Sequence, residues 1–425
     1  MKLSKFNFKS YFNGMGVIYN SLSGKFVFFD QVLWDKGFEN NEFLLKSMIE
    51  NHMIVDNQTN EDKLAELKYL DNMYDNILRL TILPTMDCNF RCKYCYEEHK
   101  KRSLSEDDVL QIEKFIRKNL SKYNGLFVDW FGGEPLLCKN IVNRLSSFFI
   151  NQCRKHGKLY FASMTTNGSL LNNDNFNQML NNRIHSFHIT IDGTKENHDF
   201  TRPFSNGKGS FNSIINNLRN IRDNSSERFK IILRTNVNKK VYSVLDEYLF
   251  FLETEFGNDN RFLFYFRPVG DWGGKRVNVV KNSMISDLDE LYNKLLTSKH
   301  NLNYDFYINL LHNSICNAAY RNSYVIAPEN RILKCTCELE NELNQIGKFI
   351  NGDMVLDNNI LSKWILKKPQ SNNTCSNCSK YAACYANTCP LNRIKGMEYP
   401  CGYDNRYLDY ILKLLIKNKE SKKSE

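Results

Sequence analysis

From residue 78 onward, short runs of apolar residues alternate with longer segments in which apolar residues recur every three or four positions. The short runs predict strands at 78–83, 126–131, 159–164, 186–191, 229–235 and 262–267. The longer segments predict helices near 104–121, 138–155, 210–222 and 241–256, with a shorter helix near 173–181. Alternating strands and helices of this kind predict an α/β fold with a parallel sheet and right-handed crossovers.

The first 75 residues follow a different pattern. Apolar runs on either side of the turn-rich segment 20–24 predict a β-hairpin over residues 14–29. Two helices are predicted next, over 42–50 and 63–76. The changes of pattern divide the chain into three predicted domains, which are residues 1–75, residues 76–299 and a cysteine-rich part over 300–425.

Composition narrows the class of protein. The chain has 425 residues, of which 42% are hydrophobic and 24% charged, as in a globular protein of two or three domains. No stretch approaches the length of an apolar membrane span, and the N-terminus lacks the pattern of a secretory signal, so we expect a cytoplasmic protein. The net charge of +10 is spread along the chain rather than concentrated in a stripe. We therefore expect neither nucleic acid nor a membrane as a partner, whereas an acidic peptide would suit the charge.

Eleven of the thirteen cysteines lie in two regions, 88–95 and 316–401. Because the cytoplasm keeps thiols reduced, this crowding favours metal ligation over disulfides. In the first region Cys88, Cys92 and Cys95 have CX3CX2C spacing, within reach of one metal centre. Thiolates are the preferred ligands of iron–sulfur clusters. Zinc is the alternative, although zinc prefers paired CX2C motifs or added histidines.

This spacing, with the aromatic Tyr94 before the last cysteine, resembles the signature of the radical S-adenosylmethionine (AdoMet, SAM) superfamily. The resemblance implies a partial (β/α)6 TIM barrel as the radical SAM core. It also implies that the three cysteines hold a four-iron (4Fe–4S) cluster whose open iron binds AdoMet, with Tyr94 beside the cofactor. Reduction would then cleave AdoMet to a 5′-deoxyadenosyl radical that removes a hydrogen atom from the substrate. The cysteine loop follows the first predicted strand, at the edge of a barrel where active sites lie.

Two segments after the second and third predicted strands resemble further motifs of this superfamily. Gly132, Gly133 and Glu134, followed by proline, resemble the GGEP motif, which accepts hydrogen bonds from the AdoMet ammonium group. Glycines suit such a site because they let the backbone approach a ligand closely. Asn167 lies in a segment that resembles the TNG motif.

The fourth predicted strand leads into a stretch that resembles SxDG…HDxxR of peptide-modifying members. The resemblance implies that Thr190 and Arg202 contact AdoMet, and an arginine suits the AdoMet carboxylate. Phe264 on the sixth strand aligns loosely with an adenine-contacting position. For His198 and Asp199 we expect local capping and structural hydrogen bonds.

The cysteines beyond residue 300 resemble the SPASM domain, an extension that binds auxiliary iron–sulfur clusters. The resemblance implies two sets of ligands: Cys316, Cys335 and Cys389 for a near cluster, and Cys375, Cys378, Cys384 and Cys401 for an outer cluster. Asn330 replaces a glycine of the family pattern, which is tolerable because asparagine also adopts left-handed conformations.

The fourth ligand of the near cluster is left open by the sequence. Some relatives carry a cysteine where this chain has Asn322. Either Cys337 is the fourth ligand, or one iron is open to a substrate thiolate.

The resemblance implies an enzyme that matures a ribosomally synthesised peptide by installing a cross-link, with a thioether favoured over a carbon–carbon bond. Residues 1–75 resemble a winged-helix-like peptide-recognition element, whose strand edge would bind the leader of the precursor peptide. The expected cofactors are AdoMet and three iron–sulfur clusters. A flavodoxin or ferredoxin is the expected electron donor.

Two alternatives differ in class. The first is an anaerobic sulfatase-maturing enzyme that forms formylglycine. Such relatives carry an aspartate base where this chain has Thr336, which cannot act as a base near neutral pH. The second is a non-enzymatic iron–sulfur electron carrier, which would need neither the GGEP motif nor the pair Thr190 and Arg202. The substrate, the residues joined and the physiological reductant stay open.

Overall fold

The protein is organised around one large twisted sheet. The computed structural model describes residues 1–270, 284–285, 287–297, 304–312, 315–366, 375, 377–387, 389–396 and 405–421. Its ten-stranded sheet has the order β11-β10-β9-β8-β7-β6-β12-β13-β14-β15. The six strands of the core are parallel: β6 (Ile77–Ile82), β7 (Gly125–Trp130), β8 (Leu159–Thr166), β9 (Ile184–Thr190), β10 (Lys230–Val237) and β11 (Phe262–Pro268). The predicted strands and their parallel order are confirmed.

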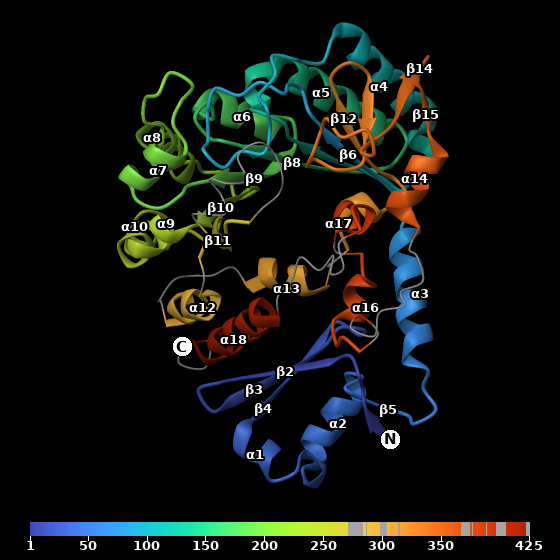
Figure 1. Ribbon diagram of the computed structural model, residues 1–425, viewed down its shortest axis with the longest axis vertical. Helices are drawn as coiled ribbons and strands as arrows, with labels where there is room; N and C mark the ends of the chain where they lie inside the picture. Colours follow the sequence, from blue (N-terminus) through green and yellow to red (C-terminus); the bar gives the residue numbers. More distant parts are fainter. Residues whose placement is uncertain are drawn as a thin grey trace.

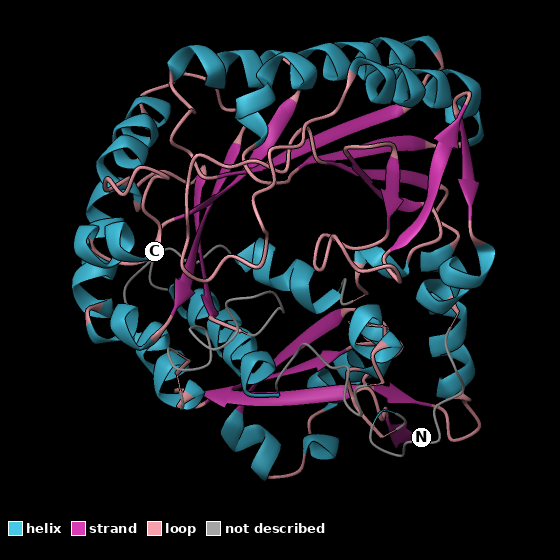
Figure 2. Cartoon of the chain, turned by 45° about the horizontal axis from the view of Figure 1, so that its top comes forward, coloured by secondary structure: helices cyan, strands magenta, loops and turns pink. Residues whose placement is uncertain are grey.

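Helices cover the outer side of this curved sheet, while loops fill the inner side (Figure 2). They are α4 (Glu106–Asn119), α5 (Lys139–Lys155), α6 (Asn173–Asn181), α7 (Lys195–Thr201), α8 (Phe211–Arg222), α9 (Lys239–Ser243) and α10 (Leu245–Phe256). Each longer helix buries an apolar stripe; in α8, for example, Ile214, Leu218 and Ile221 are buried at helical spacing. The single helix predicted over 241–256 is two helices, because Val244 has a non-helical φ of −118°.

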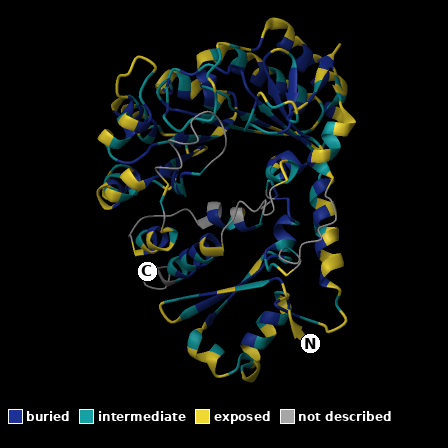
Figure 3. Ribbon diagram, in the orientation of Figure 1, coloured by how far each residue is buried: buried dark blue, intermediate teal, exposed yellow. Residues whose placement is uncertain are grey.

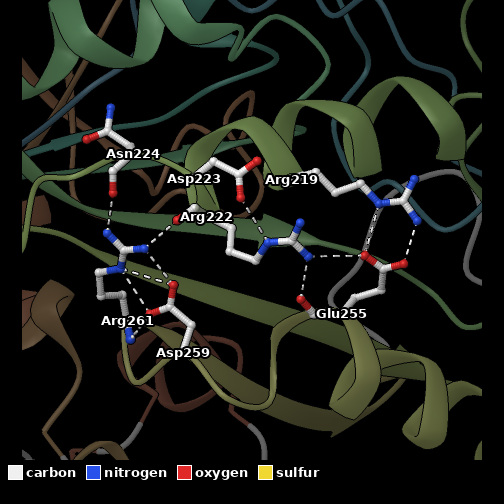
Figure 4. Close-up of polar contacts among 7 residues, drawn as sticks. All are labelled: Arg219, Arg222, Asp223, Asn224, Glu255, Asp259 and Arg261. Atoms are coloured by element: carbon white, nitrogen blue, oxygen red, sulfur yellow. Dashed lines mark hydrogen bonds and ion pairs between the residues drawn. The ribbon is translucent and has the colours of Figure 1, made fainter.

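A group of arginines ties the outer helices to the loop before β11 (Figure 4). Arg219 forms two hydrogen bonds with the Glu255 carboxylate, which joins α8 to α10. Arg261 is almost fully buried and donates to three backbone carbonyls after and within the end of α8, those of Arg222, Asn224 and Ser226. These bonds fix the outer layer that holds the strand ends in place.

The cysteine-rich C-terminal part continues the core sheet. Strand β12 (Ser323–Ala327) pairs in parallel with β6, and β13 (Arg331–Leu333), β14 (Gln345–Ile350) and β15 (Asp353–Leu356) follow in antiparallel order. Glu329 and Asn330 form the turn between β12 and β13, with φ values of 67° and 60°. Asn330 therefore adopts the left-handed conformation expected of a residue that replaces glycine. Helices α14 (Asn358–Ile365), α16 (Tyr381–Cys384) and α17 (Pro390–Ile394) follow these strands.

The N-terminal part is a small α+β unit. Its antiparallel sheet consists of β2 (Asn7–Phe12), β3 (Met15–Asn20) and β4 (Lys25–Asp30), and β1 (Lys2–Leu3) pairs with β5 (Ile54–Val55). The predicted hairpin is β3 and β4, and the predicted helices are α2 (Glu42–Glu50) and α3 (Glu61–Met73), with a short α1 (Gln31–Asp35) before them. Much of α3 is exposed along its outer side (Figure 3).

The C-terminal helix α18 (Asn405–Ser421) lies between the N-terminal sheet and helices α12 (Leu288–Thr297) and α13 (Tyr304–His312) (Figure 1). Ser10 of β2 donates a hydrogen bond of 2.5 Å to Asp409 of α18, and the Tyr19 hydroxyl donates to the Leu311 carbonyl at 3.1 Å. The two ends of the chain are thus packed together. None of the described helices is long and apolar enough to cross a membrane.

Candidate functional site

The C-terminal ends of the parallel strands surround a cavity of about 410 Å³. Its walls come from the cysteine loop after β6, the ends of β8 to β11, and one segment of the C-terminal part. The lining residues that carry the argument below are Cys92, Cys95, Thr190, Arg202, Thr336 and Cys337. Side chains predicted from motifs nearly 250 residues apart therefore face one space.

The three cysteines of the loop are well shielded from water. Cys88 and Cys92 are each 7% exposed, and Cys95 is partly buried. Burial raises the pKa of Cys88 and of Cys95 to about 12. Such thiols form thiolates at neutral pH only when a bound cation compensates for the lost solvation. The donors suit a metal centre, which would remove their protons as it binds.

The two glycines after β7 lie in close contact with the backbone of the cysteine loop. Gly132 has a φ of +102°, and a side chain there would lie 2.4 Å from the Thr85 carbonyl oxygen. A side chain at Gly133 would lie 2.1 Å from the Asp87 carbonyl oxygen. The Gly133 N–H donates to Thr85 at 3.1 Å and the Glu134 N–H donates to Asp87 at 2.9 Å. The GG pair is therefore required for close contact between two backbones.

Glu134 is fully buried and joins this turn to the end of β8. Its carboxylate accepts hydrogen bonds from the Thr166 hydroxyl and the Asn167 N–H, both at 2.7 Å. The Asn167 side chain in turn donates to the Cys88 sulfur at 3.8 Å and to Asn89 at 2.7 Å. Asn167 is thus in contact with the first cysteine, a role that the TNG resemblance alone does not indicate.

Tyr94 belongs to a buried polar network at the ends of β9 and β10. Its hydroxyl donates to Asp192 at 2.5 Å and accepts from Arg202 at 2.7 Å and from Asn236 at 3.0 Å. Arg202 is 8% exposed, and its Nε has no hydrogen-bond partner among the described residues. A buried guanidinium group with a free donor at a cavity wall suits an anionic ligand.

Thr190 also lines the cavity, whereas Phe264 is buried in the core and is not among the lining residues. Asp192 and Asn236 were not singled out from the sequence, although Asp192 lies inside the SxDG-like stretch. They orient Tyr94 and Arg202, and only the fold brings β9 and β10 together to do so.

His198 and Asp199 have structural roles, as expected. The His198 Nδ1 accepts a hydrogen bond from the Asp192 N–H at 3.2 Å, so its Nε2 carries the proton toward Ser210, 3.0 Å away. Burial, followed by the charge of Arg202, lowers the pKa of His198 to about 3 and keeps the ring neutral. The Asp199 carboxylate accepts from the Phe211 N–H at the first turn of α8.

Of the C-terminal cysteines, Cys337 lines the cavity, and Cys335 of the near set lies beside it. Burial raises the pKa of Cys316 to about 12, and Cys335 and Cys389 are close enough to add to this rise. The segment from Lys334 to Glu338 is bent rather than a strand. The Cys337 N–H donates to the Cys335 sulfur at 3.3 Å, and hydrogen bonding with the Cys337 thiol, together with burial, raises the pKa of Cys335. The two thiols therefore lie close together on one side of this bend.

Asn344 holds this bend and could not be found from the sequence. It is fully buried; its side-chain oxygen accepts from the Cys335 N–H at 2.9 Å, and its amide donates to the Cys335 and Cys337 carbonyls at 2.8 and 3.1 Å. No metal-binding pattern includes it. Its contact with the bend follows from the hairpin of β13 and β14.

The structure describes only some of the cysteines that are predicted to bind the outer cluster. Cys375, Cys378 and Cys384 lie around the turn that leads into α16, where the Cys378 N–H donates to the Cys375 carbonyl at 3.1 Å. Cys401 lies outside the described residues. The ligand assignments of both sets remain predictions.

The described residues contain no group of three or more His, Cys, Asp or Glu side chains placed around a single metal ion. The cysteine loop instead fits a larger centre: Cys88 and Cys92 are buried, Cys95 is partly buried, and Cys92 and Cys95 line the cavity together with Arg202. Cys88, Cys92 and Cys95 would hold a four-iron cluster, and Arg202 and Thr190 would contact AdoMet.

Comparison with protein families and curated proteins supports a cluster and AdoMet site at these residues. Residues 82–239 match the family model described as "Radical SAM superfamily". A cysteine-type anaerobic sulfatase-maturating enzyme from Clostridium novyi is 30% identical over 190 residues, which are 42% of this chain and 49% of that protein. The radical SAM cyclopropyl synthase TigE from Paramaledivibacter caminithermalis is 26% identical over 168 residues, 36% of this chain and 34% of TigE. The chain covers less than two thirds of the curated relatives it matches.

Two solved structures share the fold. Native anSMEcpe with bound AdoMet has a TM-score of 0.58 at 16% identity, over 80% of this chain and 98% of that chain. Streptococcus suis SuiB bound to its precursor peptide SuiA has a TM-score of 0.54 at 16% identity, over 95% of this chain and 99% of SuiB.

The matched segment runs from the end of β6 to α9 and includes the cysteine loop, the GG turn and the Tyr94 network. The superfamily whose model this segment matches implies a 4Fe–4S cluster and AdoMet. This chain therefore carries a radical SAM domain, with its central parallel sheet, and a cysteine-rich C-terminal part that continues the same sheet.

Proposed function

We propose that this chain is a radical SAM peptide maturase that installs a cross-link in a ribosomally made precursor peptide. The observation that carries the proposal is the shared cavity, which Cys92 and Cys95 line from one side and Cys337 from the other. A substrate residue in this cavity would contact both cysteine-bearing walls. When bound and reduced, the cluster and AdoMet would supply the radical that removes a hydrogen atom from that residue.

The number of clusters is the first part to test. We propose three, held by the loop, the near set and the outer set. In the triple variant of Cys88, Cys92 and Cys95 to alanine, AdoMet cleavage should be abolished while about two thirds of the iron remains. Iron per chain and 5′-deoxyadenosine are measured on the same sample. AdoMet cleavage that survives the triple substitution would contradict the assignment of the radical SAM cluster.

We infer that the cross-link is a thioether and that Cys337 completes the near set. The adjacent sulfurs of Cys335 and Cys337 support ligation by both. Joining a cysteine thiol to a carbon radical forms one C–S bond and releases one electron and one proton. An auxiliary cluster beside the cavity is suited to accept the electron.

The test is Cys337→Ala, with iron content and peptide product measured together. Loss of about one cluster's iron supports Cys337 as a ligand. Full occupancy with unchanged product instead means that one iron is open, where a substrate thiolate could bind. A product joined through carbon rather than sulfur would contradict the thioether.

We further propose that the N-terminal part binds the leader of the precursor peptide by strand addition. Among the described strands, β4 pairs only with β3, whereas α18 packs mainly over β2 and β3. The likeness to peptide-bound SuiB covers 95% of the chain and includes this part. Because α18 packs on the N-terminal sheet, deleting residues 1–75 would disturb the C-terminal part as well. Hydrogen exchange on the whole chain is the better test, and the leader should protect β4 amides but not β2 amides.

Formylglycine formation is a second candidate, favoured by the 30% identity to the clostridial sulfatase-maturating enzyme. Against it stands Thr336, which lines the cavity at the position where those relatives would carry an acidic base. A sulfatase-derived peptide with a cysteine at the modified position distinguishes the two. Oxidation of that cysteine to formylglycine would favour this candidate over cross-linking.

A further inference from the structure

Phe200 is an unusual side chain on the surface of the radical SAM core. It lies on α7 and is 47% exposed, and two ammonium groups lie over its ring. The Lys93 Nζ is 2.9 Å and the Lys240 Nζ 3.7 Å from the ring centroid. Lys93 comes from the cysteine loop and Lys240 from α9, so three separate elements meet at one aromatic ring. We call Lys93, Phe200, Lys239 and Lys240 the Phe200 patch.

The patch carries an excess of positive charge. Neither Lys93 nor Lys240 forms an ion pair with a carboxylate of the described residues, and Lys239 and Lys240 are exposed. On α7 itself, Lys195 is paired with Asp199 at 2.7 Å, which leaves the exposed Glu196 as the remaining acidic group of that helix. Two like charges at one ring repel each other, so the patch favours a partner with negative charge.

The patch also lies directly outside the predicted cluster. Lys93 stands between Cys92 and Cys95, and its backbone N–H donates to the Thr201 carbonyl of α7 at 2.9 Å. None of the four patch residues lines the cavity. A partner on the patch would be separated from the cluster cysteines by the loop alone, and a peptide in the cavity would not block its approach.

We propose that the Phe200 patch is the docking surface for an acidic protein that carries single electrons. The docked donor would be oxidised by one electron, and the cluster that Cys88, Cys92 and Cys95 would hold would accept that electron; no bond is made or broken. An exposed aromatic flanked by cations is typical of the energetically important part of an interface, and charge complementarity speeds association. The inference depends on the radical SAM chemistry and is independent of which molecule is the substrate.

The test uses Lys240→Glu and, separately, Phe200→Ser in the full chain, with reduced acidic flavodoxin as the probe. Binding of flavodoxin to the iron-free protein is measured by biolayer interferometry at low and high salt. We expect Lys240→Glu to weaken binding at least about tenfold at low salt, and wild-type binding to weaken as salt rises. AdoMet cleavage driven by flavodoxin should fall in parallel, while cleavage driven by dithionite, which needs no docking, should be unchanged.

Lys155→Glu is the matched control. It makes the same charge change on an exposed lysine at the C-terminal end of α5. This end of α5 precedes the start of β8, whereas the cysteine loop follows the end of β6, so the two lie at opposite ends of the parallel strands. Equal flavodoxin affinity in Lys240→Glu and Lys155→Glu would overturn the proposal. So would an equal loss of dithionite-driven cleavage, which would show a structural role. Reduced peptide turnover under dithionite with unchanged flavodoxin affinity would assign the patch to the substrate instead.

Discussion

At the scale of single residues, the glycines after β7 link a sequence motif to the shape of the metal-binding loop. Replacing Gly133 with alanine would place a methyl group 2.1 Å from the Asp87 carbonyl oxygen, and a backbone oxygen cannot easily move. We expect a loss of stability of about 1–3 kcal/mol and a loss of cluster iron. Thermal unfolding and iron content check this. Gly207→Ala is the control, because a side chain there meets no atom within 4 Å and adds only the backbone strain of a φ of +81°; an equal effect there would contradict the steric argument.

His198 predicts how stability depends on pH. Its pKa is about 3 in the folded protein, because burial and the charge of Arg202 disfavour the proton, whereas an unfolded histidine has a pKa near 6.5. The neutral ring thus favours the folded state above pH 6.5, and this contribution is lost as pH falls from 6.5 toward 3. We expect the melting temperature to fall over this range, and to fall less steeply in His198→Gln. Parallel curves for the two proteins would exclude His198 as a source.

The site residues could be predicted only where short motifs report them. Cys88, Arg202 and Glu134 lie in such motifs, and the structure brings them around one region. Asn344 and Asn236 lie in no motif, because their contacts arise from strand pairing between distant segments. Their roles depend on the fold and not on local spacing.

At the scale of elements, the arginines on the outer layer differ in burial and should differ in importance. Arg261 is 8% exposed and satisfies three backbone carbonyls as well as Asp259, so Arg261→Ala leaves buried polar groups unpaired. We expect a cost of about 3 kcal/mol. Arg219→Ala breaks a more exposed ion pair with Glu255 and should cost about 1 kcal/mol or less. Urea unfolding compares the two; equal costs would contradict the role of burial.

Most elements of the core follow from periodicity, since each strand there is a short apolar run and each helix has an apolar stripe. Strand β2 was missed because its sequence, NFKSYF, mixes polar and aromatic residues and only Ser10 is buried. Its place in the sheet depends on β3 beside it and α18 above it. Strands β12 to β15 were missed as well, because their pairing with β6 and with each other is not visible in local pattern.

At the scale of the whole molecule, the core sheet does not end where the sequence pattern changes near residue 300. Strand β12 covers the edge of β6, whose Leu78, Leu80 and Ile82 are buried. A chain of residues 1–299 would expose this apolar edge, and such edges promote aggregation. We expect that shortened chain to be largely insoluble. A soluble, monomeric product with native circular dichroism would contradict this expectation.

The backbone bonds around the cysteine loop also bear on how the enzyme is supplied with iron and repaired. Thr85, Asp87, Arg91 and Lys93 are tied to the GG turn and to residues 201–203 by bonds that use no sulfur. We therefore expect the loop to keep its shape without metal, unlike small zinc domains that fold only on binding metal. Iron would then bind to a preformed loop. After oxidative loss of a cluster, the folded chain could bind iron again instead of being degraded. Removing iron with a chelator should barely shift the far-ultraviolet circular dichroism, and cleavage of AdoMet should return on reconstitution.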